Sequence, residues 1–125
     1  MQSLLIDSNI LIYHLKGEEK VRRALSQWSH EKNRLFISAI TRIEVLAAPV
    51  LQEGEEAGIE ELLSEFTLIN VDIQIADVAA RIRRLYRLKL GDSIIGATTL
   101  LLNASIVTRN VRDFKKVPSL EIIRL

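Results

Sequence analysis

Four acidic side chains lie in sequence contexts unlike the charged segments that hold most of the chain's 16 acids. Asp7 follows the apolar run LLI, Glu44 lies within SAITRIEVLAA, Asp92 within LKLGDSIIGA, and Asp113 within IVTRNVRDF. An ionised carboxylate among apolar residues is costly unless a partner compensates for its burial. If all four converge, only a cation or shared protons can relieve their repulsion. Oxygen donors without cysteine favour Mg²⁺ or Mn²⁺, and Mg²⁺ is the usual partner of phosphate chemistry.

Each of these acids also has an ordinary explanation when it is taken alone. Asp7 and Asp92 suit the N-termini of helices, where free N–H groups favour a carboxylate. Asp113 suits a turn or a cap. Glu44 needs a partner, which Arg42 or another basic residue would supply. The spacing of the four acids does not establish that they converge, because only the fold brings them together.

Composition limits the class of protein. A chain of 125 residues with 48% hydrophobic residues predicts one compact domain, residues 1–125, with its own core. No run of 18 apolar residues is present, so we expect no transmembrane helix, and the N-terminus has no signal-peptide pattern. The absence of cysteine excludes disulfides and thiolate metal sites, which fits a cytoplasmic protein.

Short apolar strands and helices alternate along the whole chain. Their order predicts an α/β domain with a mainly parallel sheet covered on both faces. Ligands in such sheets bind beyond the carboxyl ends of the strands, where the strand order reverses. The predicted strands are 4–6, 35–37, 68–71, 105–108 and 120–123. The predicted helices are 8–15, 18–32, one capped by Ser38 or Thr41 and ended by Pro49, 59–66, one capped by Asp72 and ended by Gly91, and one opened by Asp92.

Charge is unevenly distributed although the net charge is only +1. Glutamates gather in segment 53–65, and segment 81–89 carries arginine and lysine with no acid. Charge runs usually form solvated helix faces. The alternative interpretation is that the basic segment contacts phosphate.

Four stretches resemble the PIN-domain family, and more narrowly the VapC-like toxin ribonucleases of bacterial and archaeal toxin–antitoxin pairs. They are IDSNILI, TRIEVLA, LGDSIIGATTL and TRNVRDF, they occur in the family's order, and the resemblance runs from about Leu4 to Leu125. The resemblance implies a three-layer α/β/α sandwich with about five strands. It also implies a ribonuclease that depends on Mg²⁺ or Mn²⁺, in which a metal-bound water attacks the phosphate in line.

The resemblance also assigns roles to individual residues. The catalytic and metal-binding acids would be Asp7, Glu44, Asp92 and Asp113. Supporting polar side chains around them would be Ser8, Asn9, Thr108 and Asn110. RNA must then cross an acidic pocket, so its phosphates need basic residues on the rim. The candidates are Arg42, Arg109, Arg112, Lys115 and Lys116, with segment 81–89 left open.

Partners follow from the same resemblance. We expect an RNA substrate, a homodimer, and a cognate antitoxin protein whose tail occupies a groove near the acids. Val50, Leu51, Leu62 and Leu63 either form such a contact surface or pack into the core. Gly91 and Pro49 depart from the family's usual pattern. Neither removes an acid, so we expect them to affect which partner the protein binds more than its catalysis. His14 and His30 lie away from the acid motifs and are interpreted as structural or solvated.

Two other functions fit the same architecture. One is a PIN-like scaffold that binds RNA or protein without useful activity, although all four acids are present. The other is a receiver-type phosphorylation switch. Such a switch needs paired acids after the first strand and a lysine after the last, whereas here one acid follows the first strand and the last strand ends with the chain.

Overall fold

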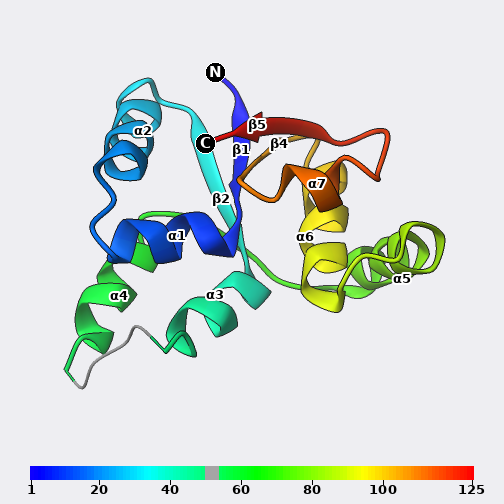
Figure 1. Ribbon diagram of the computed structural model, residues 1–125, viewed down its shortest axis with the longest axis horizontal. Helices are drawn as coiled ribbons and strands as arrows, with labels where there is room; N and C mark the ends of the chain where they lie inside the picture. The colour runs from blue at the N-terminus through cyan, green and yellow to red at the C-terminus, as the bar shows by residue number, and fades with distance from the viewer. Residues whose placement is uncertain (50–53) are drawn as a thin grey trace.

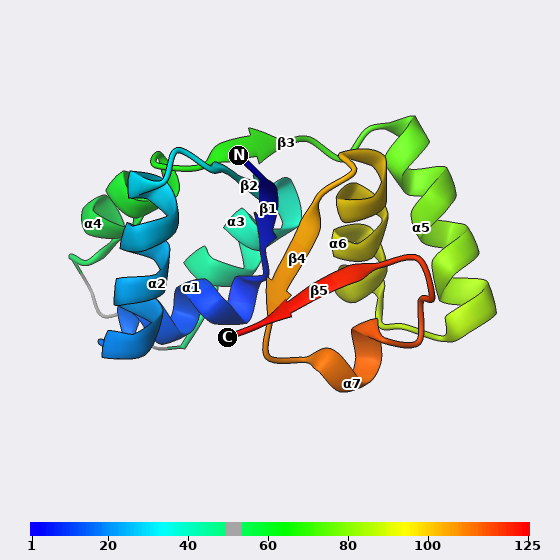
Figure 2. The same cartoon turned by 90° about the horizontal axis from the view of Figure 1, so that it is seen from above.

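A five-stranded parallel sheet forms the centre of the protein, in the order β3-β2-β1-β4-β5 (Figures 1 and 2). The computed structural model describes residues 1–49 and 54–125. All four neighbouring strand pairs are parallel, as the sequence predicts. The strands are β1 Ser3–Ile6, β2 Arg34–Ser38, β3 Thr67–Ile69, β4 Ser105–Thr108 and β5 Glu121–Arg124.

Helices cover both faces of this sheet, which confirms the three-layer α/β/α prediction (Figure 2). Alternate residues of β1 point to opposite faces, and its last three residues, Leu4, Leu5 and Ile6, are fully buried. Leu4 and Ile6 pack with α1, α2 and α4, whereas Leu5 packs with α5 and α6. The helices are α1 Ser8–Leu15, α2 Glu19–His30, α3 Ala39–Leu46, α4 Glu56–Leu63, α5 Ile73–Tyr86, α6 Leu90–Leu101 and α7 Val111–Phe114.

The order of the strands reverses between β1 and β4. From β1 the chain runs outward to β2 and β3, then returns to place β4 and β5 on the other side of β1. Because the strands are parallel, their carboxyl ends share one edge of the sheet. Asp7 follows β1 there and Thr108 ends β4, so both lie at the point where ligands of such sheets bind.

Several predicted boundaries are wrong, and the backbone explains the main one. Helix α5 ends at Tyr86 because Arg87 adopts the left-handed conformation, with φ of 58°. Gly91 therefore lies in the first turn of α6, which begins at Leu90, before Asp92. Helix α4 ends at Leu63, and β3 ends at Ile69.

The apolar residues proposed for a contact surface divide in two. Leu62 and Leu63 are buried in the core cluster that includes α1 and α2, so they pack inward and do not form a surface. Val50 and Leu51 lie outside the described residues.

The helices are short relative to a bilayer. Crossing the hydrocarbon core takes about 20 consecutive, mostly apolar residues. The longest described helix, α5, has 14 residues. Within residues 1–49 and 54–125, no helix has the length and apolarity needed to cross a membrane.

Two helix starts are fixed by side-chain caps. The Ser38 hydroxyl accepts a hydrogen bond from the Ile40 N–H at 3.2 Å, so Ser38 rather than Thr41 caps α3. The Asp72 carboxylate accepts from the Ile75 N–H at 2.9 Å, as predicted for the start of α5. Each cap satisfies an N–H group that the helix itself leaves without a partner.

Replacing the α5 cap should destabilise the fold measurably. We expect Asp72→Ala to lower the free energy of unfolding by about 1 kcal/mol in urea denaturation. Asp77→Ala is the matched control, because Asp77 is exposed in the interior of the same helix, where alanine is a better helix former. Equal stability of the two variants would show that the Asp72 hydrogen bond does not stabilise α5.

Candidate active site

Asp7 is a buried carboxylate at the carboxyl end of β1, and only 4% of the residue is exposed. Its backbone N–H donates to the Val107 carbonyl at 3.0 Å, which fixes it against β4. Its Oδ2 accepts a hydrogen bond from the Thr108 hydroxyl at 2.7 Å. Asp7 occupies the N-cap position of α1, yet its side chain makes no capping hydrogen bond. Helix capping therefore does not explain this acid.

The surroundings of Asp7 disfavour its ionised form. Burial, with the negative charges of Asp92 and Glu44, raises the pKa of Asp7 to about 6. The hydrogen bond from the Thr108 hydroxyl favours the carboxylate, as does the nearby Ser8 backbone N–H, and both oppose part of this rise in pKa. Acids from three separate elements thus lie within electrostatic reach of one another.

Glu44 is positioned by a hydroxyl that follows Asp7. The Ser8 hydroxyl donates to Glu44 Oε1 at 2.6 Å, and it lies 3.1 Å from the buried Thr41 hydroxyl. Thr41 and Glu44 are three residues apart on α3 and so share a helix face. From the sequence alone, Thr41 is identified only as a possible N-cap of this helix. The T-x-x-E spacing is the signal that would have placed it beside Glu44.

Gly91 lies close to the Glu44 carboxylate. A β-carbon at Gly91 would lie 3.4 Å from Glu44 Oε2, so the start of α6 approaches this carboxylate closely. The next residue along α6 is Asp92. The glycine therefore brings the α3 acid and the α6 acid near each other, a role that differs from the predicted helix break.

Asn110 contacts both Asp92 and Asp113. Its Nδ2 donates to Asp92 Oδ2 at 3.4 Å, and its backbone N–H donates to the Thr108 hydroxyl oxygen at 2.9 Å. A hydrogen bond from the Asn110 side chain holds the pKa of Asp113 below its usual value. The Lys116 ammonium, whose Nζ lies 3.5 Å from Asp113 Oδ1, contributes to the same shift less strongly. Burial, with the charges of Asp113 and Glu44, raises the pKa of Asp92.

The structure gathers the four predicted acids at one edge of the sheet, where Ser8, Thr108 and Asn110 contact them. Asn9 is different: it is exposed on α1 and makes none of the side-chain hydrogen bonds found among the described residues. The atoms with which the four acids could bind a metal are all carboxylate oxygens, which suits a hard divalent cation. Within residues 1–49 and 54–125, however, no three acidic or histidine side chains are placed to hold one ion together.

Two of the basic residues predicted for the rim form ion pairs with acids other than the four site acids. Arg42 pairs with Glu60 of α4 rather than near Glu44. Arg109 pairs with Glu18, and its guanidinium lies 4.5 Å from the centre of the Tyr13 ring.

The other three predicted rim cations belong to α7 and the turn that follows it. Lys116 pairs with Asp113. Arg112 and Lys115 are exposed and form no ion pair within the described part of the chain.

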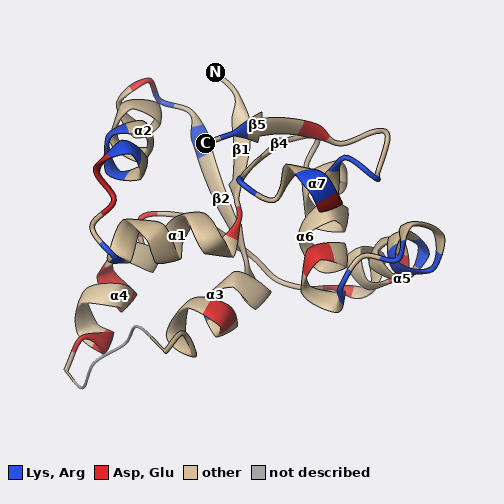
Figure 3. Cartoon of the chain, in the orientation of Figure 1, with Lys and Arg blue, Asp and Glu red and all other residues tan. Residues whose placement is uncertain are grey.

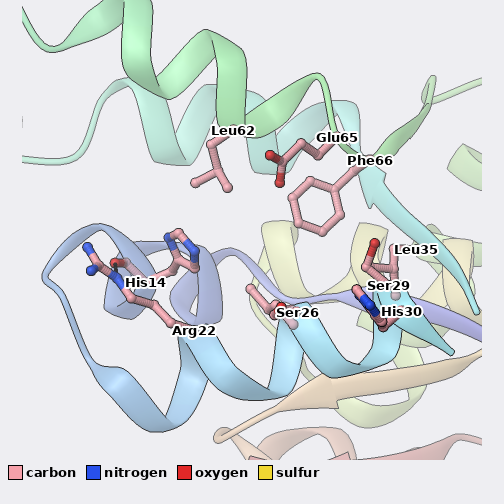
Figure 4. Close-up of a pocket in the computed structure, with 10 residues that line it drawn as sticks. His14, Arg22, Ser26, Ser29, His30, Leu35, Leu62, Glu65 and Phe66 are labelled. Atoms are coloured by element: carbon pink, nitrogen blue, oxygen red, sulfur yellow. Dashed lines mark hydrogen bonds between the residues drawn. The ribbon is translucent and has the colours of Figure 1, made fainter.

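A cavity of about 540 Å³ lies away from the acids (Figure 4). Residues of α1, α2 and α4 line it, and so do both histidines, His14 and His30. The Nδ1 atom of His14 is buried there without a hydrogen-bond partner among the described residues. None of the four acids lines this cavity, so the candidate active site is the sheet edge.

Comparison with known proteins points in the same direction. A family model described as PIN domain matches residues 4–120. Ribonuclease VapC19 of Mycobacterium tuberculosis is 31% identical over 122 residues, spanning 94% of this chain and 96% of that protein. Ribonuclease VapC1 of Rickettsia felis is 33% identical over 131 residues, spanning 96% and 94%. A chain in a toxin-antitoxin complex from Klebsiella pneumoniae superimposes with a TM-score of 0.83 at 34% identity, covering 96% of this chain and 95% of that one.

The raised pKa of Asp7 predicts a pH-dependent gain in stability for Asp7→Asn. Because the folded pKa is about 6 and the ordinary value is 3.8, ionisation destabilises the wild type as pH rises through this window. In EDTA at pH 8 the variant should be more stable by up to about 3 kcal/mol, and the gain should vanish below about pH 4. Urea denaturation across this pH range measures the difference.

Asp113→Asn is the matched control for that experiment. The pKa of Asp113 lies below its usual value, so its ionised form is favoured in the folded protein. Neutralising Asp113 should therefore give no gain at pH 8. An Asp7→Asn protein that is less stable than the wild type at pH 8 would contradict the account of a destabilising buried charge.

Proposed function

This chain belongs to the PIN-domain family of VapC ribonucleases, and on that premise we propose that it hydrolyses RNA phosphodiester bonds with a metal-activated water. The observation that carries the proposal is the gathering of Asp7, Glu44, Asp92 and Asp113 at the switch point of the sheet. Like charges placed together at a ligand-binding edge are typical of a cation-dependent active site rather than of structural caps.

The metal proposed is Mg²⁺ or Mn²⁺. Asp7 and Asp92 are the side chains that would hold it, because a cation would offset the burial and repulsion that raise the pKa of both. Glu44 and Asp113 would contribute through water, since Mg²⁺ usually keeps several of its waters. A bound divalent ion lowers the pKa of a water and stabilises negative charge on phosphate oxygens.

The chain's own polar groups prepare these acids for that role. The Thr108 hydroxyl fixes one oxygen of Asp7, and the Ser8 hydroxyl fixes one oxygen of Glu44. Asn110 holds Asp92 and favours the ionised form of Asp113. Such partners orient the acids, and losing one costs about 10- to 100-fold in metal affinity or activity. Asn9 has no comparable contact, so its assignment rests on the resemblance alone.

RNA contacts on the rim are part of the proposal. Arg112 and Lys115 are exposed and form no ion pair among the described residues, so they can meet phosphate without first breaking one. Arg42, Arg109 and Lys116 would have to exchange Glu60, Glu18 and Asp113 for RNA. The Arg42–Glu60 pair is exposed and therefore weak, so that exchange costs little. The Arg109–Glu18 pair is half-buried and makes two hydrogen bonds, so Arg109 is harder to release.

We propose further that the protein acts as the toxin of a toxin–antitoxin pair in the cytoplasm, as a homodimer silenced by its antitoxin. The similarity to a chain of the Klebsiella pneumoniae toxin-antitoxin complex supports this partner. Ile43 and Leu90, 66% and 60% exposed, flank the acids Glu44 and Asp92 in sequence. They offer apolar surface for a protein contact near the site.

Cleavage of total RNA from the host organism tests the activity directly. Discrete cuts should form with Mg²⁺ or Mn²⁺ and disappear in EDTA. Asp7→Asn and Asp92→Asn should each slow cleavage by at least about 100-fold, and Ser8→Ala by about 10-fold, because metal ligands contribute more than the groups that orient them.

Asp77→Asn is the control, because Asp77 is an exposed aspartate of α5 away from the acid cluster, and it should cleave like the wild type. Cuts that persist in EDTA would contradict the metal-dependent mechanism. Failure of the wild type to cleave RNA in either metal would favour the silent scaffold.

A further inference from the structure

Five cations form a continuous positive segment where α5 ends and α6 begins. We call Arg81, Arg83, Arg84, Arg87 and Lys89 the α5–α6 basic cluster, and all five are exposed. No acid occurs from residue 78 to residue 91. Because the net charge of the chain is +1, the rest of the protein is net negative. The cluster is visible as blue ribbon along α5 and the turn that follows it (Figure 3).

Within residues 1–49 and 54–125, no member of the α5–α6 basic cluster forms an ion pair. The ion pairs among the described residues engage Arg23, Arg42, Arg109 and Lys116, and none involves residues 81–89. Three of those four paired cations were candidates for the rim of the active site. The α5–α6 turn therefore carries positive charge that no ion pair in the described structure occupies.

The turn arranges three of the five cations around a hollow. Arg87 ends α5 in the left-handed conformation, and the buried Leu88 anchors the turn in the core. The Arg83 guanidinium donates to the Leu88 carbonyl at 3.0 Å. Arg83, Arg87, Leu88 and Lys89 together line a hollow of about 390 Å³. The backbone of the turn thus places positive side chains around one concave surface.

This surface adjoins the acids. Lys89 occupies the N-cap position of α6, whose first turn carries Asp92. Burial and neighbouring acids raise the pKa of Asp92, and the Lys89 ammonium works against that rise, so the two side chains are within electrostatic reach. A polyanion lying on the turn would meet the acidic edge of the sheet next.

We propose that the α5–α6 basic cluster binds the phosphates of the RNA backbone as the strand approaches the acids, an inference that rests on the proposed ribonuclease function. An acidic site repels RNA, so an adjoining positive surface is needed to hold the strand against it. Contacts to phosphate are independent of sequence and position the strand. Aromatic residues make up only 5% of the chain, so charge rather than base stacking supplies most of the affinity.

The test measures binding of a fluorescein-labelled oligouridine of about 20 nucleotides in EDTA, so that cleavage does not interfere. The variant is Arg87→Asn with Lys89→Gln, because asparagine tolerates the left-handed conformation. Losing two phosphate contacts should weaken binding about 10- to 30-fold near 0.1 M salt. It should also lower the slope of log K against log salt concentration by about 1.4.

Two comparison proteins separate the cluster from general charge. Lys32→Asn with Arg34→Gln removes two exposed cations, one just after α2 and one at the start of β2, and Lys32 is also left-handed, with φ of 61°. Helix α2 lies at the other end of the molecule from α5 (Figures 1 and 2). This control should bind RNA like the wild type. Arg87→Lys with Lys89→Arg keeps the charge and should do the same. If the first variant does not fold, Arg81→Gln with Arg84→Gln should show the loss instead.

Each outcome decides one claim. Unchanged binding and salt slope in the cluster variants, or an equal loss in the α2 control, would overturn the inference even if the wild type cleaves RNA. Cluster variants that lose only a polyglutamate probe would assign the surface to an acidic protein instead. A specific loss of RNA binding in a protein that cuts no RNA with Mg²⁺ or Mn²⁺ would support the cluster and refute the ribonuclease function.

Discussion

The hydrogen bond from the Thr108 hydroxyl to the buried Asp7 carboxylate joins β1 to β4 at the switch point, and the candidate site is built around it. The same hydroxyl accepts from the Asn110 N–H, and the Asn110 amide reaches Asp92. On the other side, Ser8 follows Asp7 and holds Glu44. One buried residue thus connects the ends of two strands to acids on two helices. Parallel pairing makes this possible because it brings the strand ends to one edge.

Gathering these acids lowers the stability of the metal-free protein, and the proposed metal-dependent function explains why they are nevertheless placed together. Burial and the negative charges of neighbouring acids raise the pKa of both Asp7 and Asp92. The metal-free protein therefore holds these two carboxylates in an environment that disfavours their ionised forms. A divalent cation would offset that cost, and it would also lower the repulsion that RNA meets at the sheet edge. The α5–α6 basic cluster lies beside the acids rather than among them, with Lys89 at the N-cap of the helix that carries Asp92. The proposed metal site and the proposed phosphate-binding surface are therefore separate.

The sequence predicts the layers and the place of the acids well, because strand and helix alternation together with parallel pairing determines where the strand ends meet. It also predicts the Asp72 cap, a local interaction. It does not predict that Arg87 ends α5, since glycine is the usual left-handed residue and Gly91 was the obvious candidate. The Arg109 pair with Glu18 spans 91 residues, so its partner depends on how α2 packs. Boundaries and ion pairs therefore needed the tertiary structure.

Anomalous diffraction from crystals soaked in MnCl₂ would show whether the four acids at the sheet edge form one divalent-cation site. We expect an anomalous peak within ligand distance of a carboxylate oxygen of both Asp7 and Asp92, with Glu44 and Asp113 reaching the ion directly or through water. Crystals of Asp7→Asn should lose that peak. A saturating soak that gives no peak at the sheet edge, or a peak only at surface acids elsewhere, would contradict the account.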